Sequence, residues 1–314
     1  MVSATREISI KGRKREVPAL RFGDVTIVTN GSFLTSAEVF DEYWLPAVSL
    51  PNPNQVVDYL KTRTPKPDLF TFAQRAPDGQ PRFSYHMEWD NVAAIPVSSY
   101  DHWFHKQVSS AVRRNIRTSE KKDVLVRGEP YNERYVRGVM SIFNESPIRA
   151  GRKYWHYGKD FETVQAENGT YRDRSTFLAA YVKDQMIGYM KIVWDVESAA
   201  IMQILSKMSF RDKRPNNALL SEAVKLCEKR GVKHLLYERF VYGNKGEDSL
   251  TRFKHENGFV RMNLPRYYVP LTPKGRVALR MGLHRDLKDL VPQWMRRMYV
   301  DIRDKWYAGQ MDKG

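Results

Sequence analysis

The chain has 314 residues, of which 42% are hydrophobic and 12% aromatic, a composition that excludes an intrinsically disordered chain. A chain of this length is longer than one that usually folds around a single hydrophobic core. We therefore expect two domains of about 150 residues each. Lys and Arg outnumber Asp and Glu by 52 to 36, giving a net charge of +16. That surplus favours anionic partners, although a basic protein without such a partner has the same composition.

The sequence shows no sign of a membrane span or of export. Its longest apolar runs, such as F-L-A-A-Y-V at 177–182, are far shorter than the ~20 residues that cross a bilayer. The N-terminal residues M-V-S-A-T-R-E-I-S-I lack the apolar core of a signal peptide. The single cysteine, Cys227, rules out an internal disulfide. We therefore expect a soluble, cytoplasmic protein.

Residues 1–97 are typical of a strand-rich region with short loops. Strands are predicted for R-E-I-S-I, V-T-I-V-T and G-S-F-L-T, and then for 69–74, 83–89 and 92–97. A Pro-rich loop, L-P-N-P-N, precedes a short predicted helix at 55–63, with Asn54 as its N-cap.

A basic amphipathic helix is predicted for 98–122. The apolar positions at helical spacing are Phe104, Val108, Ala111, Val112 and Ile116, and the cations on another face are Arg113, Arg114, Arg117, Lys121 and Lys122. His102 and His105 lie three apart and could share a metal ion, but no third ligand is near in sequence. Packing around Trp103 explains them more simply, so we expect no metal. A new strand at Val124 marks a domain boundary at 121–123.

The second half alternates in the order β-α-α-β-β-β-α-β-α-β. Strands are predicted at 124–127, 176–182, 186–195, 200–208, 233–240 and, as a pair, around 260–270; helices are predicted at 132–145, 161–167, 216–230 and 249–256. Gly231 is the expected C-cap of the third helix. A helical extension is expected for 271–314. Its basic amphipathic stripe, which includes Val291 and Trp306, suits peripheral membrane contact, but such stripes more often dock on their own domain.

This order, with three motifs, resembles the GNAT acyltransferase superfamily and most of all its Fem-type (FemAB-like) branch, which carries two GNAT-like domains in tandem. The motifs are S-S-A-V-R-R-N-I-R-T-S-E-K-K-D-V-L-V (109–126), R-D-K-R-P-N-N-A-L-L-S-E-A-V-K (211–225) and S-L-T-R-F-K-H-E-N-G-F (249–259). The resemblance implies an α/β (α+β) fold, a GNAT-like mixed sheet flanked by helices. A degenerate GNAT-like domain (1–122) would precede a GNAT-like acyltransferase domain (123–270).

The resemblance also implies a binding site for an acyl donor, acyl-CoA or aminoacyl-tRNA. In GNAT-like folds the donor lies where the third strand of the central hairpins splays from the next strand, and its phosphates face a helix N-terminus. The corresponding residues here are Ser206, Met208, Arg211, Lys213, Arg214, Asn216, Asn217 and Ala218. The usual glycines of that loop are missing, which predicts that Arg211, Lys213, Arg214 and the helix end bind the phosphates instead of a glycine-rich backbone. A solvated charged turn is the alternative.

Acyl transfer to an amine needs a base, donors for the oxyanion and an acid for the leaving group. Glu238, on the predicted strand 233–240, is the candidate base, since partial burial there would raise its pKa; an ion pair with Arg239 or Lys207 is the alternative. Tyr242 is the candidate acid. The resemblance to the F-K pair implies that Lys254 stabilises negative charge, the alternative being an ordinary surface lysine. Phe253 replaces the tyrosine acid of many GNAT enzymes.

The loop R-A-G-R-K-Y-W-H-Y-G-K (149–159) mixes cations with rings, which suits an anionic or sugar-containing acceptor. The expected acceptor-binding residues are Arg149, Arg152, Tyr154, His156 and Tyr157. The leading hypothesis is an N-acyltransferase acting directly on an amino sugar, a cell-wall precursor or a peptide amine. The alternatives are a nucleic-acid-binding or nucleic-acid-modifying protein with a basic surface (106–122 and 276–303), and a GNAT-like scaffold without catalysis.

Overall fold

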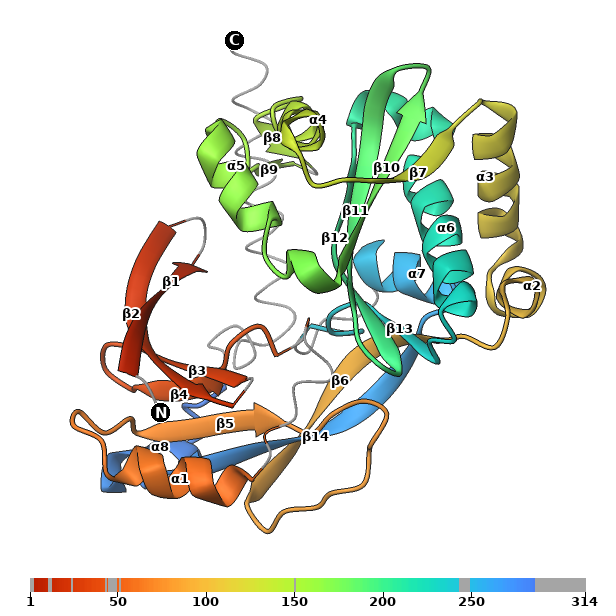
Figure 1. Cartoon of the computed structure of the whole chain (residues 1–314). Helices are drawn as coiled ribbons and strands as arrows, with labels where there is room; N and C mark the ends of the chain where they lie inside the picture. Colours follow the sequence, from red (N-terminus) through yellow and green to blue (C-terminus); the bar gives the residue numbers. More distant parts are fainter. Residues whose placement is uncertain are drawn as a thin grey trace. The chain divides into compact units, whose positions relative to one another are not determined.

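The computed structural model describes residues 3–10, 13–23, 25–42, 44, 50, 52–149, 151–242 and 249–285. The chain forms two compact units (Figure 1). Unit 1 comprises 1–92, 241–244 and 262–293, and unit 2 comprises 93–240, 245–261 and 294–314. Among the described residues, no helix is long and apolar enough to cross a membrane. The expected basic stripe in the C-terminal extension lies outside the described residues.

Unit 1 is built on a mixed sheet with the strand order β1-β2-β3-β4-β5-β14-β6. Its strands are β1 (Ser3–Ile10), β2 (Arg13–Phe22), β3 (Val25–Asn30), β4 (Ser36–Val39), β5 (Leu69–Ala73), β6 (His86–Pro96) and β14 (Val260–Pro270). β4 and β5 run parallel, whereas β5 and β14 are antiparallel. The predicted strand G-S-F-L-T is wrong: the strand begins one residue after it, at Ser36.

Two short helices belong to unit 1, α1 (Pro53–Lys61) and α8 (Pro273–Arg280). The N-cap of α1 is Asn52, whose side chain accepts the Asn54 N–H, because Pro53 takes the first helical position. The prediction of Asn54 as the cap is therefore wrong. The apolar face of α1 and the inner side chains of β3, β5 and β14 share one buried cluster, which includes Phe70 and Tyr267.

Unit 2 contains a second run of strands in the order β13-β12-β11-β10-β7. These are β7 (Leu125–Glu129), β10 (Ser175–Val182), β11 (Gln185–Trp194), β12 (Ser198–Ser206) and β13 (His234–Leu236). The pairs from β7 to β12 are antiparallel, and β12 with β13 is parallel. The far end of β6 continues into this unit, where Ala94–Pro96 pair with β13.

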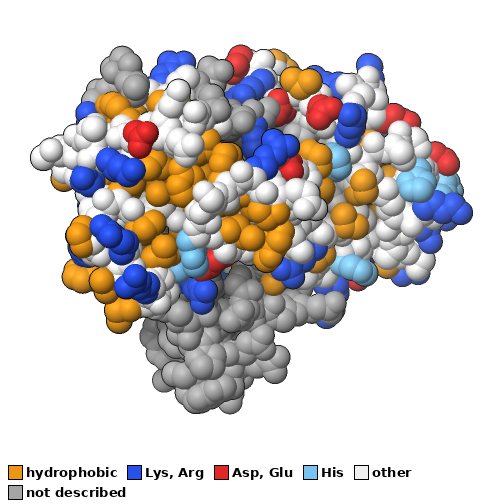
Figure 2. All heavy atoms as spheres, turned by 90° about the horizontal axis from the view of Figure 1, so that it is seen from below, with side chains coloured by type: hydrophobic (Ala, Val, Ile, Leu, Met, Phe, Trp, Pro, Cys, Tyr) orange, Lys and Arg blue, Asp and Glu red, His pale blue; other side chains and the backbone are white. Residues whose placement is uncertain are grey.

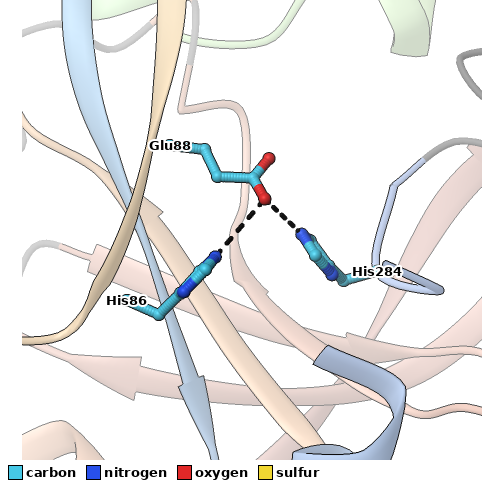
Figure 3. Close-up of side chains that lie close together, drawn as sticks. All are labelled: His86, Glu88 and His284. Carbon is cyan, nitrogen blue, oxygen red and sulfur yellow. Dashed lines mark hydrogen bonds and ion pairs between the residues drawn. The ribbon is translucent and has the colours of Figure 1, made fainter. Parts of the chain in front are cut away.

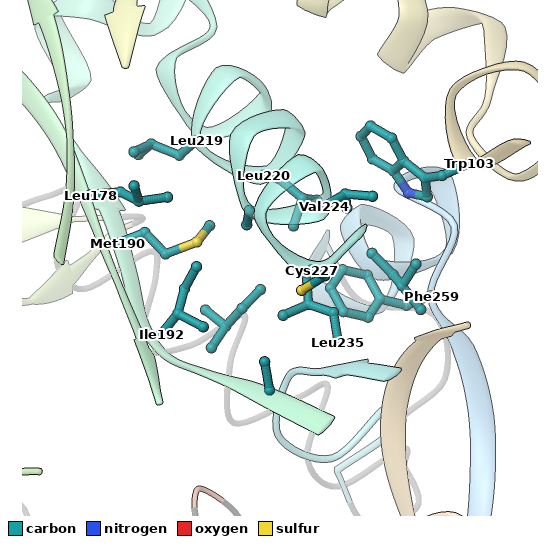
Figure 4. Close-up of a cluster of buried hydrophobic side chains, with 14 of the residues drawn as sticks. Trp103, Leu178, Met190, Ile192, Leu219, Leu220, Val224, Cys227, Leu235 and Phe259 are labelled. Carbon is teal, nitrogen blue, oxygen red and sulfur yellow. The ribbon is translucent and has the colours of Figure 1, made fainter. Parts of the chain in front are cut away.

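Helices cover both faces of this sheet. α3 (Ser110–Lys121) and α6 (Pro215–Lys229) pack on one face, and α4 (Glu133–Phe143) and α5 (Phe161–Asn168) lie on the other (Figure 1). The predicted apolar face of α6 is confirmed: Leu219, Leu220, Ala223, Val224 and Cys227 are all fully buried. They meet Leu178, Met190 and Ile192 from the sheet, with Trp103 and Phe259 beside them (Figure 4).

The predicted element order of the second half is confirmed, with a small hairpin, β8 (Ile148–Arg149) and β9 (Arg152–Lys153), added after α4, and with α7 (Ser249–Glu256) where it was expected. Gly231 has φ of +68° directly after α6, as a C-cap glycine should. The mixed α/β class with helices flanking a sheet is likewise confirmed.

The predicted continuous helix at 98–122 is wrong. The segment consists of α2 (Tyr100–His102), a π-helical turn η1 (Trp103–Gln107) and α3, with Val108 extended at ψ of 151°. The break lets Trp103 become fully buried and donate its Nε1–H to the Asn257 carbonyl at 3.0 Å. Trp103 is thus packed as expected.

The two compact units differ from the expected domain limits. α3 belongs to unit 2, because Val112 and Ile116 pack into the same core as α6. The predicted strands 83–89 and 92–97 form the single strand β6, and the pair expected around 260–270 is the single strand β14. Both strands pass from one unit to the other, so sequence limits at 122 and 270 do not coincide with the compact units.

Candidate functional site

Strands β12 and β13 diverge within the unit 2 sheet. β13 pairs with β12 only between Ser198–Ala200 and His234–Leu236, whereas β12 stays paired with β11 as far as Ser206. After Leu236 the chain turns to β6: Tyr237 N–H donates to the Ala93 carbonyl at 2.9 Å. Among the described strands, none pairs with β12 beyond Ala200 on this edge, which leaves backbone groups for a ligand. This matches the expected splay.

The loop after β12 is held by one carboxylate. Glu145, which follows α4, accepts the N–H of Met208 at 2.6 Å, the N–H of Ser209 at 2.9 Å and the Ser209 hydroxyl at 2.7 Å. Burial alone would raise the pKa of Glu145, but these hydrogen bonds outweigh burial, and the pKa lies below its usual value of 4.5. A side chain therefore shapes this loop, which lacks the glycines that the resemblance led us to look for.

The expected loop at 211–217 is partly helical. A 3-10 helix, η3 (Met208–Lys213), leads to Arg214, whose left-handed backbone (φ of +57°) occupies a conformation that normally favours glycine. Pro215 is then the first residue of α6. Arg211 and Arg214 are exposed and Lys213 is half-buried, so the three cations stand at the surface of the loop.

The start of α6 offers fewer donors than expected. The N–H groups of Asn217 and Ala218 donate to the Arg214 carbonyl at 3.1 and 3.3 Å. Asn217 Nδ2 also donates to Asn257 Oδ1 at 3.2 Å, which ties α6 to the end of α7. The side-chain Oδ1 of Asn216 is buried without a hydrogen-bond partner in the described structure. A buried oxygen without a partner costs free energy. Asn216 is therefore the residue at this helix start best suited to accept a hydrogen bond from a bound ligand.

Lys254 lies on the β13 side of the splay. It is fully buried, its Nζ donates to the Arg239 carbonyl at 2.5 Å, and it lies 4.8 Å from the centroid of the Tyr237 ring. The interpretation of Lys254 as a surface lysine is therefore wrong. Burying an ammonium group costs free energy unless the group is paired. Buried charged residues are therefore concentrated at functional sites.

Glu238 directly precedes Arg239, the residue whose carbonyl accepts the hydrogen bond from Lys254. The predicted strand 233–240 is too long: β13 ends at Leu236, and Glu238 lies in a bend with φ of +47°, where its carbonyl accepts the Ala93 N–H at 2.8 Å. Glu238 is half-buried. Tyr242 belongs to unit 1, so it is not part of the group that unit 2 assembles.

Of the five expected acceptor residues, three are packed together, and one of these, Arg149, reaches the donor loop. Arg149 donates to the Ser206 carbonyl, has a second terminal nitrogen buried without a partner, and lies over the Tyr154 ring at 5.2 Å. Burial raises the pKa of Tyr154 to about 12. His156 packs on Phe143, with ring centroids 4.2 Å apart.

The five expected acceptor residues differ in burial. Burial, with help from Lys159 and Arg149, lowers the pKa of His156 to about 3, so the ring is neutral at physiological pH. Arg152 and Tyr157 are exposed and make no contact with the donor loop among the interactions described. Arg149 thus connects the expected acceptor and donor regions.

Sequence reasoning missed Glu145. An E-S-P at the end of a helix carries no signal for a carboxylate that reaches a loop more than 60 residues away. The buried lysine could have been suspected from its place between Phe253 and the buried Phe259, but a lysine in a polar helix is normally exposed.

No protein-family model matches the chain, and no curated protein matches it by sequence. Among solved structures, FemX has a TM-score of 0.55 and 9% identity, covering 84% of this chain and 88% of its own. L-PGS from Bacillus licheniformis has a TM-score of 0.51 and 14% identity, covering 78% and 81%. The C-terminal domain of a protein described as a lysylphosphatidylglycerol synthetase from Agrobacterium fabrum has a TM-score of 0.50 and 9% identity. The match covers 88% of this chain and 87% of that domain. Identities this low concern the fold alone: the chain shares the fold of FemX.

Proposed function

We propose that this protein is an N-acyltransferase that moves an acyl or aminoacyl group from an activated donor directly to an amine. The observation that carries the proposal is the splay between β12 and β13 beside the start of α6. The β12 side of the splay has an unpaired strand edge, an unpartnered Asn216 oxygen and a cationic loop. A fully buried lysine lies on the other side. No other described part of this unit combines these features.

In this reaction the acceptor nitrogen bonds to the donor carbonyl carbon, and the bond from that carbon to the leaving sulfur or oxygen breaks. Glu238 takes the proton that the amine loses. The Lys254 charge favours the negative oxygen of the tetrahedral intermediate. The leaving sulfur or oxygen takes up a proton from water, because Tyr242, the acid expected from the sequence, belongs to unit 1. Neither a nucleophilic side chain nor a covalent enzyme intermediate is needed.

The donor is acyl-CoA or aminoacyl-tRNA, and the surface of α3 favours the second. A hollow of about 370 Å³ lies along the outer face of α3, lined by Ser110, Arg113, Arg114, Arg117, Thr118 and Lys121. Lys122, at the end of that helix, pairs with Asp212 of the donor loop at 2.7 Å. Cations continuing from the loop onto a helix suit a chain of phosphates, longer than the single pyrophosphate of CoA.

The acceptor class follows from the β8–β9 region. Arg149, with an unpartnered buried nitrogen, and the rings of Tyr154 and His156 suit an anionic or sugar-containing amine, such as an amino sugar, a cell-wall precursor or a peptide amine. The name lysylphosphatidylglycerol synthetase denotes an enzyme that makes an aminoacylated lipid, which supports an aminoacyl group as cargo.

A nucleic-acid-binding protein without acyl transfer is the second candidate, since the α3 hollow would serve it equally. On the face drawn in Figure 2, however, Lys and Arg side chains stand among hydrophobic and acidic ones rather than forming one basic field. A scaffold without catalysis would need neither the buried Lys254 nor the splayed strands.

Thermal shifts with CoA, acetyl-CoA and charged or uncharged tRNA, at two salt concentrations, test the donor. We expect stabilisation by tRNA that falls steeply with salt. R114E/K121E should weaken tRNA binding at least about tenfold and flatten its salt slope. The charge-matched control R134E/K229E should leave it unchanged. If acetyl-CoA stabilises and tRNA does not, the donor is CoA. If neither does, the acyltransferase proposal is wrong, and tRNA binding without transfer to any amine supports the second candidate.

A further inference from the structure

Unit 1 holds a cluster of two imidazoles and a carboxylate that the proposed transfer reaction does not use. His86 and Glu88 are two residues apart on β6, so their side chains leave the same face of the strand. His284 follows α8 and the turn at Gly282, whose φ is +71°. One ring nitrogen of each histidine and one carboxylate oxygen all lie within 4.8 Å of one another. Figure 3 shows both rings directed at the Glu88 carboxylate.

The two distances to the Glu88 carboxylate suit a small metal ion. His86 Nε2 is 3.4 Å from Glu88 Oε1, and His284 Nε2 is 2.8 Å from the same oxygen. A tetrahedral zinc ion with bonds of ~2.0–2.1 Å separates neighbouring ligands by about 3.3 Å. The first separation fits without change, and the second needs an opening of about half an ångström. Two histidines and one glutamate are an established ligand set for zinc with a fourth, open position.

We propose that His86, Glu88 and His284 bind one divalent transition-metal ion, with zinc as the best-fitting ion. Their burial supports this, because the His284 side chain is only 2% exposed and that of Glu88 24%, while His86 at 48% leaves a route for entry. His284 is also held by its Tyr268 neighbour, with ring centroids 4.5 Å apart. Two of the three ligands are therefore positioned before the ion arrives.

An ion-pair network around Glu88 is the competing interpretation. Arg285 contacts Glu88 Oε1 at 3.0 Å, and His86 and His284 contact the same oxygen at 3.4 and 2.8 Å. The Arg285 side chain is 51% exposed and can move into water, whereas His284 cannot. A metal ion would thus replace Arg285 as the main positive charge beside Glu88.

The structural consequence is a link across the chain. The ion would join β6 to the residues that follow α8, nearly 200 positions later in the sequence. Because the unfolded chain lacks this arrangement, metal binding would add to the stability of unit 1. This proposal does not depend on the transfer reaction, and its failure would leave that reaction untouched.

The test uses the full chain, stripped with a chelator and titrated with zinc against a chromophoric competitor. We expect one zinc ion per chain, a higher melting temperature, and the visible absorption of tetrahedral cobalt when cobalt replaces zinc. H86N, E88Q and H284Q should each weaken zinc binding by at least about tenfold. H86N changes an exposed ligand, so its fold is expected to persist even if H284Q unfolds; circular dichroism checks this.

His105→Asn is the matched control, because His105 is an exposed histidine that pairs with Asp101 at 3.4 Å outside the cluster. This variant should bind zinc like the wild type. The proposal is overturned if the wild-type chain takes up less than one ion, if H86N and E88Q bind zinc as tightly as the wild type, or if H105N loses as much affinity as they do. In each of those cases the cluster is an ion-pair network only.

Discussion

Replacing Glu145 by Gln should loosen the donor loop without unfolding the protein. The carboxylate accepts three hydrogen bonds, from the N–H of Met208, the N–H of Ser209 and the Ser209 hydroxyl, at 2.6 to 2.9 Å. Its side chain is only 16% exposed. Gln keeps one acceptor oxygen but removes the charge and turns an NH₂ group toward a backbone N–H.

The magnitude follows from those contacts. Hydrogen bonds to a charged group contribute about 1.5–3 kcal/mol each, and a buried donor left unpaired costs about 1–3 kcal/mol. Since Gln can retain one or two of the three bonds, we expect a local loss of about 3 kcal/mol, which corresponds to roughly a hundredfold increase in the opening equilibrium. The loop can open by itself, so the melting temperature should change less than this implies.

Hydrogen exchange of the amides at 206–213, followed by mass spectrometry, measures that opening. E145Q should exchange there roughly a hundredfold faster at neutral pH. Glu133→Gln is the control, because Glu133 begins α4, the helix that Glu145 follows, but is 65% exposed in an i,i+4 pair with Arg137. Exchange within about threefold of the wild type, or an equal effect in E133Q, would refute the role assigned to Glu145.

The same carboxylate predicts a pH dependence. The pKa of Glu145 is lowered in the folded protein, so its contribution to stability is present above the unfolded value of about 4.3 and is lost as the pH falls through the folded pKa. Loop protection in the wild type should therefore fall at acidic pH. In E145Q this pH dependence should be much weaker.

Three further predictions concern other residues. K254M should reduce the rate of acyl transfer by about 10²–10³-fold, and K254R should retain more of it. Product formation measures the rate, and circular dichroism checks folding. If K254M is as active as the wild type, Lys254 is not part of the site. The pKa of His156 is lowered to about 3, so it binds protons more readily when unfolded, and stability should fall as pH drops from about 6.5 towards 3. H156F should flatten that slope, and a His156 NMR titration near pH 6.5 would contradict the burial argument. Burial raises the pKa of the Cys227 thiol to about 12. It should therefore react with a thiol reagent only after unfolding, and fast labelling of the native protein would show that α6 is packed differently.

Local pattern was sufficient for most elements of unit 2. The apolar stripe of α6, the C-cap at Gly231 and the helix at Ser249–Glu256 were all predictable, because helical spacing and capping depend on residues within one or two turns. The order of these elements was enough to indicate the GNAT-like fold. Register and strand length were less accessible: β13 is three residues long because the chain leaves β12 after Leu236 and turns to β6.

The residues of the candidate site divide in the same way. Sequence order placed Ser206–Asn217 beside a helix start, since strand, loop and helix are neighbours in the chain. Tertiary structure alone decided that Glu145 holds this loop, that Lys254 is buried, and that His284 meets His86 and Glu88. Each of these contacts joins segments that lie from 15 to almost 200 residues apart. Periodicity carries no information about such pairs, because they form only when the elements pack.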